Sequence, residues 1–350
     1  MRGGTVKVGT RGSPLALAQT RLVIQRLKEF HPKLNFIEVL IRTSGDRITS
    51  AAELRRAGKG LFVKEIERAL LAKKISMAVH SMKDLPSELP EGLTIGAVLE
   101  RADASDVFIG RGSMPIEKLP PGAQVGTSSL RRQAILRSLF PHLEFVEMKG
   151  NLDTRLEKLR GPRSPLAGIV VAAAGVRRLY PDNGVPVQIL PRDKVVPAAG
   201  QGAIAIEIRA ADEDMRELVK PVHHEITGAC VEAKREFQRR LEGGCQVPMG
   251  AHAESSEDGL LRLTACLASL DGRKVIRESQ TGTVDDPKSI AEALETIVNS
   301  RGAQEILAGI RPAGTRSVRP HRNGKAHGGR GRKARARSTR RPRARARSRR

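Results

Sequence analysis

Short apolar runs alternate with longer amphipathic stretches through the first two thirds of the chain. The runs are long enough for buried strands, and several of the stretches between them repeat apolar residues at helical spacing. Predicted strands cover residues 5–8, 36–41, 75–79, 93–99, 107–109, 143–148, 169–174 and 203–208, and predicted helices cover 14–30 and 61–72 and follow residues 129 and 151. This alternation predicts α/β lobes.

The pattern changes after Pro221. A helix is expected around 231–241, and residues 260–270 alternate apolar and polar side chains before an Asp271-Gly272 turn and a partner strand at 274–280. Asp286 and Pro287 then begin a closing helix. We expect a small antiparallel α+β domain with Cys266 in its core.

One strand-to-helix turn occurs twice. Val8-Gly9-Thr10 and Val125-Gly126-Thr127 each lead from a strand toward a helix. In the first copy, Ser13 suits the N-cap and Pro14 the first helical position. Free N–H groups at such helix starts bind anions, so two lobes facing a shared cleft are predicted. For the first turn taken alone, an ordinary connection is equally consistent.

Asp84 is the first candidate for chemistry. It follows the predicted strand 75–79, and Pro86 prevents that strand from continuing. Ligands gather outside the carboxyl ends of strands in open α/β sheets, so an acid placed there can transfer protons. A helix cap, or a surface carboxylate paired with Lys83, is the alternative.

Cations also follow the predicted strands. Each alone suits a solvated surface, but together they predict a basic cleft, because guanidinium groups match carboxylates. The cations are Arg11, Arg131, Arg132, Lys149, Arg155, Arg177 and Arg178. Arg131 and Arg132 fall in the first turn of a predicted helix, where a cation opposes the helix dipole.

Three cysteines occur, with no C-x-x-C pair and no Cys/His cluster at metal spacing. Two glycines precede Cys245, which is either a covalent anchor on an exposed loop or an incidental cysteine. His223-His224 has no evident partner ligand, so a structural role is favoured and no metal is expected. With neither a signal peptide nor a long apolar segment, the chain is expected in the cytoplasm, without a membrane span.

The positive charge is concentrated at one end. Of 62 Lys and Arg residues, 17 lie in residues 311–350, which contain no Asp or Glu, so residues 1–310 carry a net charge of only +7. This tail is expected to be disordered and to contact nucleic acid or another polyanion, or else to be an unselected extension. Nucleic-acid binding as the main function is disfavoured, because aromatic residues make up only 2% of the chain.

Seven segments in one order give a more specific indication. VGTRGSPLALAQ, GKGLFVKE, AVHSMKDLP, VGTSSLRRQ, GNLDTRL, PAAGQGA and LEGGCQVPMGA together resemble the porphobilinogen deaminase family over about residues 5–310. The resemblance implies a transferase of haem biosynthesis that joins four porphobilinogens on a covalent dipyrromethane cofactor, releasing ammonia and then hydroxymethylbilane. It implies no membrane association, and a monomer is expected.

The resemblance also implies an architecture. Two lobes of the periplasmic-binding-protein type are expected, the first at 1–101 plus 196–219 and the second at 102–195. An α+β domain would cover 220–310, followed by the tail.

Roles for individual residues follow from the resemblance. Cys245 would carry the cofactor through a thioether, and Asp84 would protonate the departing amine and then stabilise the pyrrole N–H of the resulting cation. Cofactor carboxylates would be received by Lys83, Ser129, Arg131 and Arg132. Substrate carboxylates would be received by Arg11, Ser13, Lys149, Arg155 and Arg178. Lys59 and Phe62 would belong to a cover loop.

Two positions depart from the family's pattern. Lys149 stands where Arg is common, which exchanges a planar fork for a point charge and predicts a weaker grip without loss of activity. Lys234 stands where an acid is usual, with unclear effect. The rival interpretation is a non-catalytic, two-lobed anion-binding module, which would need neither Asp84 nor Cys245.

Overall fold

The computed structural model describes residues 4–47, 60–182, 184–241 and 247–310. Within these ranges it contains two five-stranded mixed sheets and one three-stranded antiparallel sheet. Three predicted features lie outside the described residues: Lys59, Cys245 and the tail at 311–350.

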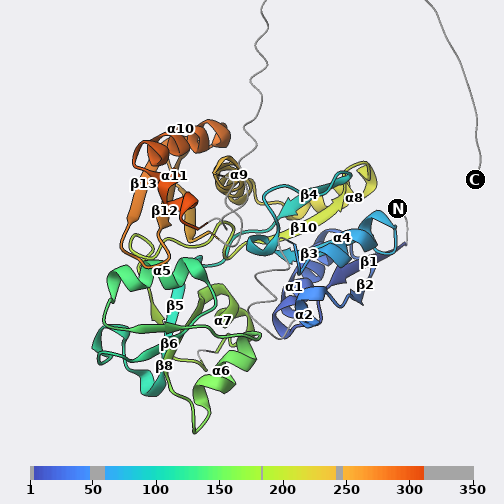
Figure 1. The fold of residues 1–350 in the computed structure, drawn as a ribbon. Coiled ribbons are helices and arrows are strands. Elements are labelled where there is room, and N and C mark those ends of the chain that lie inside the picture. Colours follow the sequence, from blue (N-terminus) through green and yellow to red (C-terminus); the bar gives the residue numbers. More distant parts are fainter. Residues whose placement is uncertain (1–3, 48–59, 183, 242–246, 311–350) are drawn as a thin grey trace, which may run out of the picture. The chain divides into compact units, whose positions relative to one another are not determined.

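The first sheet has the order β2-β1-β3-β10-β4 (Figure 1). Its strands β1, β2 and β3 run parallel, and β10 is antiparallel to both of its neighbours. The strands are β1 (Thr5–Thr10), β2 (Asn35–Leu40), β3 (Met77–Ser81), β4 (Leu93–Val98) and β10 (Ile204–Arg209). The helices are α1 (Pro14–Phe30), α2 (Ser44–Arg47), α4 (Lys64–Leu71), α8 (Glu213–Val219) and the 3₁₀ turns η1 (Met82–Asp84) and η4 (Lys220–Val222).

The second sheet repeats this arrangement with the order β7-β6-β8-β5-β9. Strands β7, β6 and β8 are parallel, and β5 is antiparallel to β8. The strands are β5 (Asp106–Gly110), β6 (Gln124–Gly126), β7 (Glu144–Val146), β8 (Leu166–Ala172) and β9 (Gln188–Ile189). The helices are α5 (Leu130–Leu139), α6 (Leu152–Arg160), α7 (Ala173–Leu179) and the 3₁₀ turns η2 (Arg111–Ser113) and η3 (Ile116–Lys118).

The two Gly-Thr turns occupy matching places in the two sheets. Gly9 lies in β1 and Gly126 in β6, and each of these strands is second in its sheet, with a parallel neighbour on both sides. Ser13 caps α1 and Ser129 caps α5, each through its hydroxyl oxygen. The predicted pair of related α/β lobes is therefore confirmed.

Two crossing segments carry the chain between the lobes. The first, 99–105, leads from β4 into β5, and the second, 190–203, leads from β9 into β10. They are hydrogen-bonded to each other where Ala102 N donates to Gly202 O at 3.3 Å. Gly202 has a φ of +88°, and a Cβ there would lie 2.4 Å from the carbonyl oxygen of Ala102, so only glycine permits this approach. The exact domain boundaries stay a prediction.

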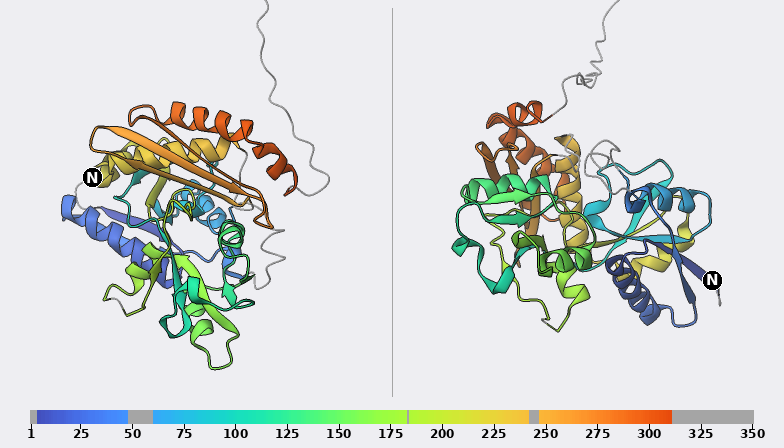
Figure 2. Two further views of the ribbon diagram at one scale, coloured as in Figure 1. Left: turned by 90° about the vertical axis from the view of Figure 1, so that its left-hand side faces the viewer. Right: turned by 60° about the horizontal axis from the view of Figure 1, so that its bottom comes forward.

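The third sheet is the meander β11-β12-β13. Its elements are β11 (Met249–Ser255), β12 (Leu260–Ala268), β13 (Val275–Thr283), α9 (Glu225–Arg240), α10 (Pro287–Ser300) and α11 (Ala303–Ala308). Figure 2 shows α9 and α10 running along this sheet, and their buried faces form one core with it. Cys266 is fully buried, as predicted, but not in the core of its own domain: alternate residues of β12 face opposite sides, and Cys266 packs with residues of the second lobe. Asp286 caps α10. The predicted α+β domain is confirmed, and with it the fold class.

Some local predictions were wrong in extent. The four-residue helix α2 lies where a loop was expected, because Asp46 closes a turn by accepting hydrogen bonds from the N–H and the hydroxyl of Thr43. Helix α9 begins six residues before the predicted start, because His224 caps it by accepting a hydrogen bond from Thr227 N at 3.1 Å. No helix among the described residues is long and apolar enough to cross a bilayer.

Candidate active site

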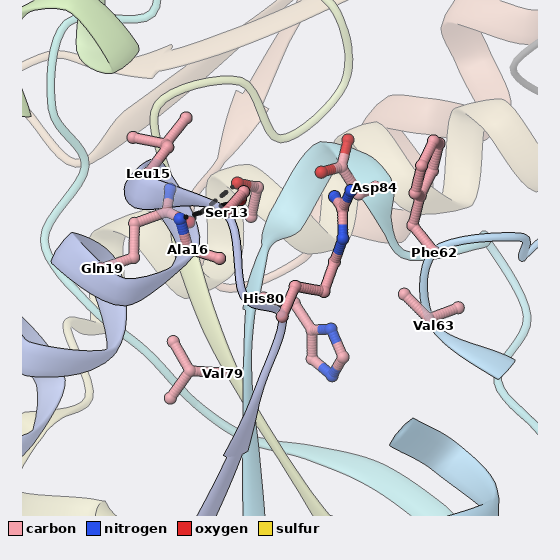
Figure 3. Close-up of a pocket in the computed structure, with 11 residues that line it drawn as sticks. Ser13, Leu15, Ala16, Gln19, Phe62, Val63, Val79, His80 and Asp84 are labelled. Carbon is pink, nitrogen blue, oxygen red and sulfur yellow. Dashed lines mark hydrogen bonds between the residues drawn. The ribbon is translucent and has the colours of Figure 1, made fainter. Parts of the chain in front are cut away.

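Asp84 lies where the sequence predicted, directly beyond the end of β3. Strand β3 ends at Ser81, and the 3₁₀ turn η1 then carries the chain through Asp84. Its carboxyl group lines a pocket together with residues from α1, from β3, from the turn after β1 and from the segment just before α4. Figure 3 shows Asp84 and Phe62 at one side of this pocket, with His80 below them. The other lining residues are Arg11, Ser13, Leu15, Ala16, Gln19, Val63, Val79 and Ser81.

Arg11 lies between an acid and an aromatic ring in this pocket. Its guanidinium group is 2.5 Å from the Asp46 carboxylate and 4.3 Å from the centre of the Phe62 ring. Burial alone would raise the pKa of Asp46, but hydrogen bonds from Arg11 and Thr43 outweigh burial and lower it. The Arg11 cation is thus held in place by an ionised partner before any substrate arrives.

Asp106, at the start of β5, binds both arginines of the first turn of α5. Its carboxylate is fully buried and lies 2.7 Å from Arg131 Nη1 and 2.7 Å from Arg132 Nη2, and Arg132 Nε donates a further hydrogen bond at 2.9 Å. The two guanidinium groups lower the pKa of Asp106 far below its ordinary value although burial alone would raise it. Gln201 also donates to Asp106, at 2.8 Å. One carboxylate therefore fixes two cations that a helix start would otherwise repel.

Lys83 and Arg155 share the electrostatic field of this cluster. Lys83 is partly exposed by surface area but densely surrounded by protein, and burial followed by repulsion from Arg132 lowers its pKa to about 8. Burial, then Arg132, likewise lowers the pKa of Arg155 to about 10. Burial lowers the pKa of Arg178 to about 10, and this guanidinium donates to Gly202 O at 2.8 Å. These groups come from both lobes.

Two of the cations predicted to bind carboxylates have hydrogen-bond donors without a partner among the described residues. Lys149 Nζ and Arg131 Nε are both buried and find no partner among the described residues. Unpaired buried donors are costly, and a charged acceptor such as a carboxylate would satisfy them. The site is therefore suited to a ligand that carries several carboxylates.

Matches to known families identify the chain. A family model described as "Porphobilinogen deaminase, dipyromethane cofactor binding domain" matches residues 6–217, and one described as "Porphobilinogen deaminase, C-terminal domain" matches residues 228–296. The chain belongs to the porphobilinogen deaminase family. The predicted transferase function in tetrapyrrole biosynthesis, with porphobilinogen as substrate and dipyrromethane as cofactor, is confirmed, and the non-catalytic alternative is not favoured.

Individual relatives match this chain over nearly the whole of their own length. The porphobilinogen deaminase of Carboxydothermus hydrogenoformans is 46% identical over 306 residues, covering 87% of this chain and 97% of the relative. That of Desulforudis audaxviator is 47% identical, covering 87% and 98%. Among solved structures, the methionine-binding protein MetQ matches at 14% identity and a TM-score of 0.38, covering 62% of this chain and 87% of that chain.

The donor set fits the cofactor of a porphobilinogen deaminase. Dipyrromethane carries acetate and propionate groups, and the described residues offer clustered cations with the unpaired Lys149 Nζ and Arg131 Nε among them. Cys245 and Lys59 lie outside the described residues, so their roles stay predictions. The segment with Cys245 is flanked by α9 and β11.

Sequence reasoning missed three acids that shape this site. Asp106 partners Arg131 and Arg132, Asp46 partners Arg11, and Glu207 accepts from His80 in a buried pair at 3.0 Å beside the pocket. One signal for Asp106 was available: two adjacent arginines at a helix start need a counter-charge, and an acid that opens an apolar strand can supply it.

Replacing Asp106 by Asn is expected to lower the free energy of unfolding by about 3–5 kcal/mol, because two buried guanidinium groups would lose their counter-charge. Urea unfolding followed by circular dichroism measures this difference. The matched control is Asp285→Asn at an exposed acid, which should change stability by less than about 0.5 kcal/mol. Equal stabilities of the two variants would contradict the structural role of Asp106.

Proposed function

We propose that Asp84 is the proton donor of this porphobilinogen deaminase and that Cys245 holds its dipyrromethane cofactor. The observation that carries the proposal is the position of Asp84. Its carboxyl group lies at a strand end, in a pocket with Arg11 and Ser13, and in the electrostatic field of Lys83. An acid surrounded by groups that bind carboxylates can meet the amine of a polycarboxylate substrate.

The cations of the cleft would position the ligands. Lys83, Ser129, Arg131 and Arg132 are proposed to hold the carboxylates of the cofactor, which when bound would supply the free pyrrole carbon that receives the first unit. Because Asp106 already fixes both guanidinium groups, ligand binding needs little further ordering of these side chains. Porphobilinogen would be held by Arg11, Ser13, Lys149, Arg155 and Arg178.

Asp84 would then move the proton. Its protonated carboxyl group donates to the aminomethyl nitrogen of porphobilinogen, the carbon–nitrogen bond breaks, and ammonia leaves with the bonding electron pair. The resulting substrate cation has a pyrrole N–H, which donates a hydrogen bond to the Asp84 carboxylate. The carboxylate thus stabilises positive charge as the charge develops. Phe62 and Arg11 lie against each other at one side of this pocket and would limit the access of water from that side.

Intact mass spectrometry tests the attachment site. The purified protein should exceed its sequence mass by one dipyrromethane unit, and Cys245→Ala should lack this increment and be inactive. Cys230→Ala is the matched control, because Cys230 is a free buried cysteine in α9. If Cys245→Ala keeps the increment, or if unmodified protein turns over normally, the attachment at Cys245 is refuted.

Replacing Asp84 by Asn should lower kcat by about 10²–10⁴-fold, since an amide of the same shape cannot donate the proton. The loss should appear in steady-state formation of hydroxymethylbilane while circular dichroism and the melting temperature stay unchanged. The control is Asp193→Asn, at an exposed acid of the second crossing segment. A near-normal rate for Asp84→Asn would contradict the assignment.

Cofactor loading should depend on pH through Lys83. Its pKa of about 8 lies below the ordinary 10.5, so the side chain loses its positive charge above pH 8 instead of above pH 10. Incubation of cofactor-free protein with porphobilinogen, followed by mass spectrometry, should show loading about tenfold slower at pH 9 than at pH 7. Lys83→Arg keeps its charge and should load at similar rates at both values. An identical pH profile for both proteins would count against Lys83.

The protein is proposed to be a monomer that works in the cytoplasm. Its tail, residues 311–350, is proposed to contact polyanions without taking part in catalysis. Its 17 basic residues are unopposed by acids, and the charge density alone supports electrostatic binding. Truncation after residue 310 should leave hydroxymethylbilane formation unchanged and weaken retention on a DNA column at low salt. A truncated protein that elutes at the same salt concentration as the full chain would refute the contact.

A further inference from the structure

Lys234 is a buried cation with no acidic partner. It lies in the middle of α9 with 1% of its surface exposed, and no hydrogen bond or ion pair to it is found among the described residues. Burial and then repulsion from Arg101 lower its pKa to about 7. The charged form of a lysine in this position is costly unless something negative compensates it.

The surrounding groups increase the positive charge. His252 is buried, with Nδ1 3.5 Å from an Arg101 nitrogen and Nε2 3.3 Å from an Arg192 nitrogen. Burial, followed by repulsion from Arg101, Lys234 and Arg192, lowers the pKa of His252 far below its ordinary value, so the ring is neutral. Three cations therefore surround one neutral imidazole.

The acids nearby compensate other cations. Glu254 is 53% exposed and lies 3.8 Å from Arg192 and 3.6 Å from His252 Nε2. Asp103 pairs with Arg177 at 3.2 Å. Burial raises the pKa of the Cys230 thiol, which therefore remains uncharged. Among the described residues, no carboxylate thus forms an ion pair with Arg101 or Lys234, and Glu254 and Asp103 attract Arg101 only from beyond ion-pair distance.

The cluster lies where three segments of the chain meet. Arg101 belongs to the first crossing segment, Arg192 to the second, and Lys234 and His252 to the α+β domain. Backbone contacts join the same segments: Arg101 N donates to Thr227 Oγ1 at 3.3 Å, and Ala251 N donates to Pro197 O at 2.9 Å. An anion held here would link the α+β domain to both connections between the lobes.

We propose that Arg101 and Lys234 bind a small inorganic oxyanion such as phosphate. Its oxygens would accept hydrogen bonds from the guanidinium group and from the buried ammonium group, and its charge would offset the surrounding cations. Arg101 is partly exposed and Arg192 is 43% exposed, whereas Lys234 is only 1% exposed, so an anion would enter the cluster on the side of the two arginines. The cluster around Asp106 shows how this fold compensates two buried cations when a carboxylate is present.

The test measures the melting temperature of the full-length holoenzyme at about pH 6.5. Phosphate replaces a bulky sulfonate buffer at constant ionic strength, and the melting temperature of the wild type should rise by about 2–4 °C and then saturate. Lys234→Met should lose most of this rise. The matched control is Lys288→Met, which removes an exposed lysine of the same domain and should keep the rise in full. The control also accounts for phosphate bound in the catalytic cleft.

Two further arms do not depend on the Met variant folding. Lys234→Glu gives Arg101 a carboxylate partner and should melt higher than the wild type without phosphate, with little response to phosphate. At about pH 9 the wild-type Lys234 is neutral and should lose the response that it shows at pH 6.5. Equal rises in the wild type and Lys234→Met, an undiminished response at pH 9, or no response in the wild type would overturn the proposal.

Discussion

The carboxylate of Asp106 is fully buried, and Arg131 and Arg132 both bind it. Asp106 opens β5, the first strand after the chain enters the second lobe, and both arginines lie in the first turn of α5. Cations at a helix start oppose the helix dipole, so this arrangement would be unfavourable without the acid. Desolvating three charges makes the cluster a weak source of stability, but it gives the side chains a defined geometry.

The same cluster connects the site to the second crossing segment between the lobes. Gln201, in the second crossing segment, donates to Asp106, and Arg131 donates to the carbonyl oxygen of Val196 in that segment. Arg178 reaches the same segment at Gly202. A change in the angle between the lobes would therefore shift the cations that are proposed to receive carboxylates. This coupling gives a physical reason why binding and domain movement would be linked in a porphobilinogen deaminase.

Features set by neighbouring residues could be predicted from the sequence. The start of α1 follows from Ser13 and Pro14, and the position of Asp84 follows from the apolar run before it and Pro86 after it. Ion pairs between residues far apart in the sequence could not be predicted in this way. Asp106 is 25 residues from Arg131, and Arg11 is 35 residues from Asp46, and neither spacing carries a local signal. The family resemblance supplied Cys245 and its cofactor, which composition and periodicity alone left open.

The central claim is that Asp106 holds the arginines in the position that receives the cofactor. A crystal structure of the holoprotein tests it most directly. The account predicts electron density continuous from the Cys245 sulfur into two pyrrole rings, with ring carboxylates within hydrogen-bond distance of Arg131 and Arg132 while both arginines remain bound to Asp106. Rings whose carboxylates lie away from these arginines, or arginines that leave Asp106 to reach them, would contradict it.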